Sequence, residues 1–212
     1  MPEGPNDLVR LDAFAEPQTG AGTPMALAAA RARTPWVTDD DVAAVLALED
    51  ELQAPRLSIG LALFHESGWK AWARNEITQA TGIMQWTPPN APVPVGRLLA
   101  MRFAEQFPFA AAWFRKWLAP FRGGPIPSAG VVYAAVAAPG KITGAMDDMT
   151  VLYRKPDPEP PDEKKLEWAW YANPTWRHPD DPDVIRVRAL SHVLERDALT
   201  PEWAPFAARM LA

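Results

Sequence analysis

The sequence predicts a mainly α-helical protein. Several segments carry apolar residues at the spacing of one helix face, some begin after a capping residue, and convincing alternating strands are few. A chain of 212 residues can bury one sizeable core. We therefore expect residues 1–35 to be a flexible tail or tether and residues 36–212 to form one domain with a helical extension at its C-terminal end.

The elements follow in order along the chain. Residues 1–35 are rich in Pro, Gly, Ala and Thr without a sustained period, which is typical of a tail. Thr38 is the expected N-cap of a first helix, because acidic residues and then an apolar stripe follow it. A second helix is expected to begin near Pro55 and to stop at Gly68. It is apolar on nearly all sides, which indicates a buried helix.

The second half of the chain predicts further helices. Residues 90–121 favour one or two amphipathic helices interrupted near Pro108, and residues 127–140 favour a short apolar helix. A charged, Pro-rich surface loop is expected over residues 154–165. Two terminal helical patterns cover residues 183–199 and 201–212.

Composition excludes several classes of function. The net charge is -5 with scattered basic residues, which disfavours nucleic acid and anionic membranes as partners. The absence of cysteine excludes a disulfide framework, a thiolate zinc site and a cysteine nucleophile. No apolar run is long enough for a membrane span, and the N-terminal residues lack the pattern of a secretory signal. We expect synthesis in the cytoplasm, with any extracellular target reached by lysis or by another particle.

Glu66 is the first candidate for catalysis. It ends the buried helix, where both desolvation and the negative end of the helix dipole disfavour its anion. A carboxyl group that keeps its proton near neutral pH can protonate a glycosidic oxygen. Neighbouring His65 points about 100° away from Glu66 on a helix, so a packing or surface role is expected for it.

The segment "ESGWKAWARNEITQATGIMQW", residues 66–86, resembles the signature of the soluble lytic transglycosylase and goose-type lysozyme superfamily, particularly its phage-borne and tail-associated members. The matching residues are Glu66-Ser67, Asn75, Ala80-Thr81-Gly82 and Ile83-Met84-Gln85. A second match lies in "VVYAAVAAP", where Tyr133 stands in the place of a tyrosine that faces the catalytic acid. The family often has Asn-Ala-Gly after this tyrosine, and Ala134-Ala135-Val136 stand here instead. The resemblance covers roughly residues 40–195.

The resemblance implies a lysozyme-like domain with Glu66 as the catalytic acid and no metal or cofactor. Its implied substrate-binding residues are Ser67, Asn75, Gly82, Met84, Gln85, Trp86 and Tyr133. Gly82 would let the backbone approach the substrate. Trp69, Trp72 and Trp86 flank the acid, and Trp86 is the first candidate to stack on a sugar ring, although core packing explains it equally well.

The implied reaction needs one carboxyl group only. Glu66 would protonate the bond between N-acetylmuramic acid and N-acetylglucosamine, and then take the proton from the 6-hydroxyl group that attacks within the same sugar. The implied product is a 1,6-anhydromuramyl end, and the implied partner is the glycan strand of peptidoglycan.

Two alternatives stay open. The same fold could be a hydrolase in which Glu76 or Asp147 steers a water molecule. The chain could also be a non-catalytic structural or glycan-binding module of a phage tail or contractile injection particle, attached to other particle proteins through its N-terminal tail. Asp180, Asp181 and Asp183 lack the pattern of a calcium loop, so they favour a helix N-terminus over a metal site.

Overall fold

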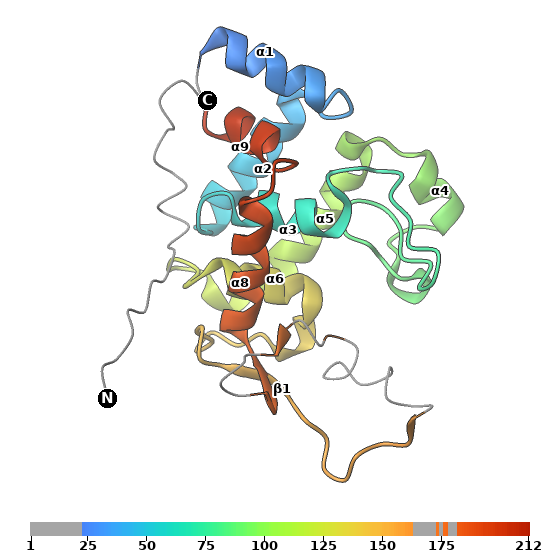
Figure 1. Ribbon diagram of the computed structural model, residues 1–212, viewed down its shortest axis with the longest axis vertical. Coiled ribbons are helices and arrows are strands. Elements are labelled where there is room, and N and C mark those ends of the chain that lie inside the picture. The colour runs from blue at the N-terminus through green and yellow to red at the C-terminus, as the bar shows by residue number, and fades with distance from the viewer. Residues whose placement is uncertain (1–22, 163–172, 174–175, 178–181) are drawn as a thin grey trace.

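The computed structural model describes residues 23–162, 173, 176–177 and 182–212, and these residues are mainly helical, as predicted (Figure 1). The α-helices are α1 (Pro24–Arg33), α2 (Asp39–Leu52), α3 (Ser58–Ser67), α4 (Val95–Ala100), α5 (Phe103–Trp117), α6 (Ala129–Ala137), α8 (Val187–Ala198) and α9 (Ala204–Met210). Short 3-10 turns lie at η2 (Pro88–Asn90), η3 (Ala119–Phe121) and η4 (Pro139–Lys141). Strands β1 (Val151–Arg154) and β2 (Val184–Arg186) form an antiparallel pair.

Helix α3 lies at the centre of the fold and packs against α2, α6 and α8 (Figure 1). Its residues from Ser58 to Leu63 are all buried, which confirms the prediction of a buried helix. The helix ends where Gly68 adopts a left-handed conformation (φ 60°), as expected from its sequence. It begins three residues later than predicted. Leu57 has a positive φ of 68°, which is not a right-handed helical conformation, so Ser58 is the first residue of the helix.

The start of α2 has the predicted cap. The side chain of Thr38 accepts a hydrogen bond from the Asp41 backbone, and the Asp41 carboxylate accepts one from the Thr38 backbone. This reciprocal capping box satisfies two N–H groups that the first turn would otherwise leave unpaired.

The prediction of a tail over residues 1–35 was wrong for residues 24–33, which form α1. Helix α1 packs against α9, and the two are joined through buried Arg209, whose guanidinium donates to the backbone oxygens of Thr34 and Val37 and to Asp39. The segment is rich in alanine, which favours a helix but leaves no clear apolar stripe in the sequence. Residues 1–22 lie outside the described part of the chain.

The break between α4 and α5 lies at Met101 and Arg102, and not near Pro108 as predicted. Glu105 accepts a hydrogen bond from the Arg102 backbone and starts α5 there. Pro108 stands inside α5, where its ring removes one backbone hydrogen bond without ending the helix.

The C-terminal segment also departs from the prediction. Residues 184–186 form β2, with Val184 and Ile185 buried, and α8 begins only at Val187. Helices α8 and α9 contribute Leu190, Leu194 and Phe206 to the same core cluster as α3 and α6, so they are integral to the domain and do not form an appended extension. The charged segment after β1 is a loop up to Asp162, as expected.

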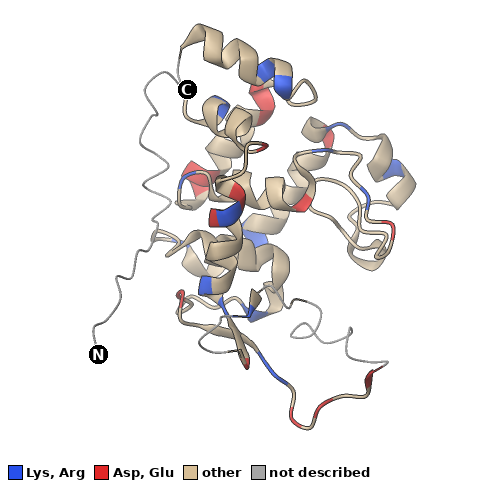
Figure 2. Cartoon of the chain, viewed as in Figure 1, with Lys and Arg blue, Asp and Glu red and all other residues tan. Residues whose placement is uncertain are grey.

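Charged residues are distributed over many elements. Figure 2 shows Lys and Arg on helices and loops throughout the described chain, interspersed with Asp and Glu. None of the helices in this part of the chain is both long and apolar enough to cross a membrane.

Candidate active site

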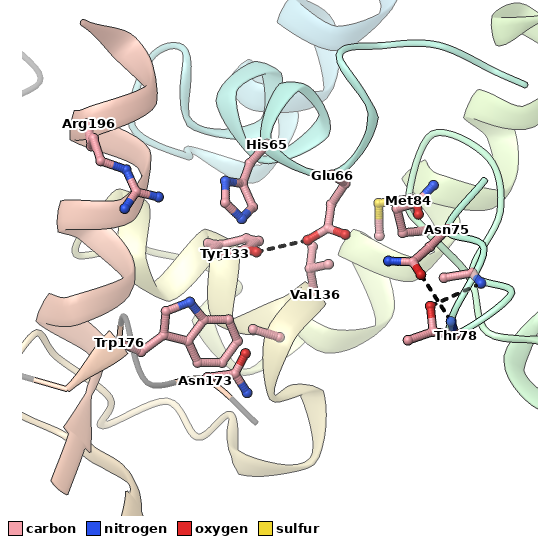
Figure 3. A pocket seen from close by; sticks show the side chains of 13 residues that line it. His65, Glu66, Asn75, Thr78, Met84, Tyr133, Val136, Asn173, Trp176 and Arg196 are labelled. Atoms are coloured by element: carbon pink, nitrogen blue, oxygen red, sulfur yellow. Dashed lines mark hydrogen bonds between the residues drawn. The ribbon is translucent and has the colours of Figure 1, made fainter. Parts of the chain in front are cut away.

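A cavity of about 510 Å³ lies at the C-terminal end of α3 (Figure 3). Its walls come from α3, the segment between α3 and η2, α6, α8 and the chain around residue 176. Five of the residues predicted from the sequence line it together: Glu66, Asn75, Met84, Gln85 and Tyr133. The other lining residues are His65, Thr78, Ala80, Val136, Ala137, Asn173, Trp176 and Arg196.

Glu66 reaches into this cavity from the last turn of α3. The hydroxyl group of Tyr133, on α6, donates a hydrogen bond of 2.9 Å to Glu66 Oε1, so Tyr133 faces Glu66 as the family resemblance implied (Figure 3). Burial raises the pKa of Glu66 above its ordinary value, opposed by the Tyr133 hydrogen bond and by the charge of His65. Glu66 therefore retains its proton to higher pH than a solvated glutamate.

Tyr133 is fixed by its surroundings. Its side chain is buried, and its ring meets the rings of His65 and Trp176 edge to face, with centroids 5.1 Å and 6.3 Å away. Burial and the neighbouring Glu66 carboxyl raise the pKa of Tyr133, so its hydroxyl group remains a hydrogen-bond donor.

The segment after α3 folds back on itself to form the opposite wall. The backbone of Thr81 forms one antiparallel β-bridge with Arg74 and another with Trp86. Gln85 has a positive φ of 48°, and its amide group donates to the backbone oxygen of Gly82 at 3.0 Å. Asn75 Oδ1 accepts from the backbone of Thr78, and Figure 3 shows the Asn75 amide nitrogen turned toward the side of Glu66. That nitrogen can donate to a bound ligand.

Two predicted substrate-binding residues have structural contacts instead. The hydroxyl group of Ser67 donates to the backbone oxygens of Leu63 and Ile83, and it joins α3 to the folded-back segment. At Gly82, φ is +81°, and an added Cβ would lie 2.5 Å from the Gln106 amide oxygen. Gly82 is therefore needed for its backbone conformation and for the approach of Gln106, and it is not among the residues that line the cavity.

Gln106 is a residue that the sequence analysis missed. It is fully buried, accepts a hydrogen bond from the Ile83 backbone and donates to the backbone oxygens of Ala71 and Leu98. One side chain on α5 thus holds the segment that carries Met84 and Gln85. A glutamine on the apolar side of an amphipathic helix was the only signal that could have revealed it.

The three tryptophans near Glu66 have different environments. Trp69 is fully buried, stacks on Phe103 with centroids 5.0 Å apart, and donates to the Gly60 backbone oxygen. Trp72 is 54% exposed, whereas Trp86 is buried. Trp86 lines a second cavity of about 350 Å³ with Trp113 and Trp117. This cavity shares Met84, Gln85 and Val136 with the first, so the two hollows are neighbours.

His65, for which a packing or surface role was predicted, packs its ring against Tyr133. It lines the cavity, and its Nδ1 lies 2.5 Å from Asp197 Oδ2. Helix twist does turn it away from Glu66, but α6 and α8 both pack along this side of α3 and enclose it in the same cavity. Asn173 and Trp176 also line the cavity, and no role was predicted for either residue from the sequence.

The residues proposed for hydrolysis lie elsewhere. Glu76 and Asp147 are both exposed, and neither lines the cavity. Among the described lining residues Glu66 is the sole carboxylic acid. The described residues contain no group of three or more His, Asp or Glu side chains that could hold a metal ion. Asp180 and Asp181 lie outside the described residues, and Asp183 immediately precedes β2.

We compared the chain with protein-family models, with curated proteins and with solved structures, and none of the three comparisons found a match.

Proposed function

We propose that the protein is a lytic transglycosylase with a lysozyme-like domain, which cleaves the glycan strands of peptidoglycan. The observation that carries the proposal is the pairing of Glu66 with Tyr133 at 2.9 Å, at the end of a buried helix and in the wall of a cavity. The family resemblance of residues 66–86 adds the substrate class. The same resemblance suggests that the protein travels in a phage tail or contractile injection particle and acts in the cell wall.

The chemistry needs an acid that donates and then recovers a proton. Protonated Glu66 gives its proton to the oxygen that links N-acetylmuramic acid to N-acetylglucosamine, and the bond between this oxygen and the muramyl anomeric carbon breaks. The 6-hydroxyl group of the same muramyl residue attacks that carbon and returns its proton to the Glu66 carboxylate. The new bond closes a 1,6-anhydro ring, no water is consumed, and the enzyme ends as it began.

The surroundings of Glu66 support this route over hydrolysis. Usual glycoside hydrolases need a second carboxyl group beside the scissile bond. Glu66 is the sole carboxylic acid among the described lining residues, and the two residues considered for a second role, Glu76 and Asp147, are exposed outside the cavity. An internal nucleophile, supplied by the substrate, removes the need for a second acid.

A digest of purified cell-wall sacculi tests the proposal. We expect the unmodified protein to release fragments whose muramyl ends weigh one water less than reducing ends, as measured by mass spectrometry. Glu66→Gln should release none. Glu76→Gln makes the same chemical change at an exposed position ten residues away and serves as the matched control, with full activity expected.

Each other outcome rejects a defined part of the proposal. Release of reducing ends only would identify a hydrolase. Binding of sacculi without release of any fragment would identify a non-catalytic glycan-binding module. Equal activity of the Glu66→Gln variant and the unmodified protein would remove Glu66 from the reaction altogether.

A further inference from the structure

Arg196 brings a positive charge to the wall of the main cavity. It lies in the last turn of α8, its side chain is 61% exposed, and it lines the cavity opposite the segment that carries Asn75. Figure 3 shows its guanidinium group directed toward the space beside His65 and Tyr133. Arg196 plays no part in the reaction described above.

Positive charge predominates among the side chains that line the cavity. Among the described lining residues, Glu66, His65 and Arg196 are the ones whose side chains can carry a charge near neutral pH. Burial favours the protonated, neutral form of Glu66. A guanidinium group, such as that of Arg196, is the positively charged group best suited to pair with a carboxylate. The cavity is therefore suited to a ligand that carries a negative charge on the side of α8.

Among the described residues, the guanidinium group of Arg196 forms an ion pair with Asp197 only. Arg196 Nε lies 3.9 Å from Asp197 Oδ1, at the outer limit of an ion pair. The other oxygen of Asp197 is 2.5 Å from His65 Nδ1, so the carboxylate is already oriented toward the histidine. The flat fork of guanidinium donors remains available to a second carboxylate, for which its geometry is suited.

A series of contacts connects Arg196 to Glu66, the proposed catalytic acid. Asp197 joins Arg196 to His65, the ring of His65 packs against the ring of Tyr133, and Tyr133 donates to Glu66. Glu66 and Arg196 line the same cavity, so a sugar chain that fills it would lie beside both residues. In peptidoglycan, every second sugar carries a lactyl ether, whose carboxyl group is either free or extended by an acidic peptide.

We propose that Arg196 is a substrate-binding residue that pairs with a carboxylate on the muramyl residue bound beside Glu66. This inference rests on the proposed function, because it requires a muramyl glycan in the cavity. It adds a preference for muramyl strands over neutral chitin-type strands of the same length. The carboxylate has two sources, the free lactyl group of a strand without peptides and the peptide of an intact strand.

Binding measurements in a cleavage-deficient protein test this inference. Isothermal titration of Glu66→Gln would use three probes: chitotetraose, a muramyl tetrasaccharide without peptides, and the same tetrasaccharide with its peptides. We expect the additional change Arg196→Gln to weaken binding of a carboxylate-bearing probe about fivefold at low salt, as for a partly solvated ion pair. Binding of chitotetraose should not change.

The pattern of loss identifies the carboxylate. A loss confined to the probe with peptides assigns the peptide, and a loss confined to the probe without them assigns the free lactyl group. Arg97→Gln removes the same charge from an exposed position on α4, outside the cavity, and should leave binding of all three probes unchanged. Thermal melting of each variant checks that the fold is retained.

Two results would overturn the inference, and they differ. If the saccharides bind but Arg196→Gln affects all three probes equally or none, Arg196 has no role in recognising a carboxylate, while the proposed function stands. If no saccharide binds and the unmodified protein releases nothing from sacculi, the proposed function fails and this inference fails with it.

Discussion

The contact between α6 and α8 determines where Tyr133 lies, and Gly130 makes this contact possible. A Cβ atom added at Gly130 would lie 2.4 Å from Ser191 Oγ and 2.5 Å from the backbone oxygen of Val187. The serine side chain can rotate away, but the carbonyl group belongs to α8 itself. Ordinary contact begins at 3.4 Å, so Gly130→Ala has to separate the two helices by about 0.9 Å.

The cost of this separation can be estimated from the packing. Overpacking of a close helix contact costs about 1–3 kcal/mol, and the higher helix propensity of alanine returns about 1 kcal/mol. Because the obstacle is backbone, we take the upper end and expect Gly130→Ala to lower the free energy of unfolding by about 2 kcal/mol. Tyr133 would move with α6 and its hydrogen bond to Glu66 would be disturbed, so cleavage of sacculi should fall as well.

Gly96→Ala is the matched control. Gly96 also lies in a helix, α4, but an added Cβ there would meet nothing within 4 Å. This variant should be more stable than the unmodified protein by about 0.5–1 kcal/mol. Urea denaturation followed by tryptophan fluorescence measures both changes. Equal free energies of unfolding for the Gly130 and Gly96 variants would show that the α6–α8 contact yields without cost, and our reasoning about the position of Tyr133 would be wrong.

Three further predictions concern single side chains. Tyr133→Phe removes a hydrogen bond that lowers the pKa of Glu66, so this pKa should rise further. The alkaline limb of the kcat/KM profile follows loss of the Glu66 proton and should therefore move to higher pH. An unmoved limb would contradict the assignment of Glu66 as the acid. Burial raises the pKa of Glu49 from 4.5 to about 7. A stabilisation of about 3 kcal/mol, present below pH 4.5, should therefore be lost as the pH rises through 7. In urea denaturation, Glu49→Gln should make the free energy of unfolding less dependent on pH over this range. Gln106→Met should lower the free energy of unfolding by about 3 kcal/mol, measured in the same way, because it leaves buried backbone groups of Ala71, Ile83 and Leu98 unpaired; a loss below 1 kcal/mol would refute this.

The sequence predicted those features that local chemistry determines. The cap at Thr38, the buried character of α3 and its end at Gly68 all follow from residues within a few positions of each other. The contact of Tyr133 with Glu66 joins residues 67 positions apart, and it was predicted from the family resemblance alone. Local pattern without the resemblance would have left Glu66 as one acidic residue at the end of a helix.

The features that were missed depend on distant partners. Helix α1 has no strong apolar stripe, and its place in the fold depends on α9 and on Arg209 at the far end of the chain. Residues 184–186 were predicted to start a helix, but they pair with β1, whose residues lie 30 to 35 positions earlier in the chain. The family resemblance assigned Ser67 and Gly82 to the substrate, and their contacts with Ile83 and Gln106 could not be seen in the sequence.

The position of Glu66 depends on both ends of α3. At the first end, no side chain on Leu57 caps the helix, and the buried carboxyl group of Glu49 accepts hydrogen bonds from the backbones of Leu57, Ile59 and Gly60 instead. At the other end, Ser67 joins the helix to the Ile83 backbone. A single carboxyl group that both donates and recovers a proton must stay within reach of two different substrate oxygens. Attachment of the helix at both ends limits the drift of Glu66, and the proposed reaction depends on this restraint because Glu66 is the sole carboxylic acid among the described residues that line the cavity.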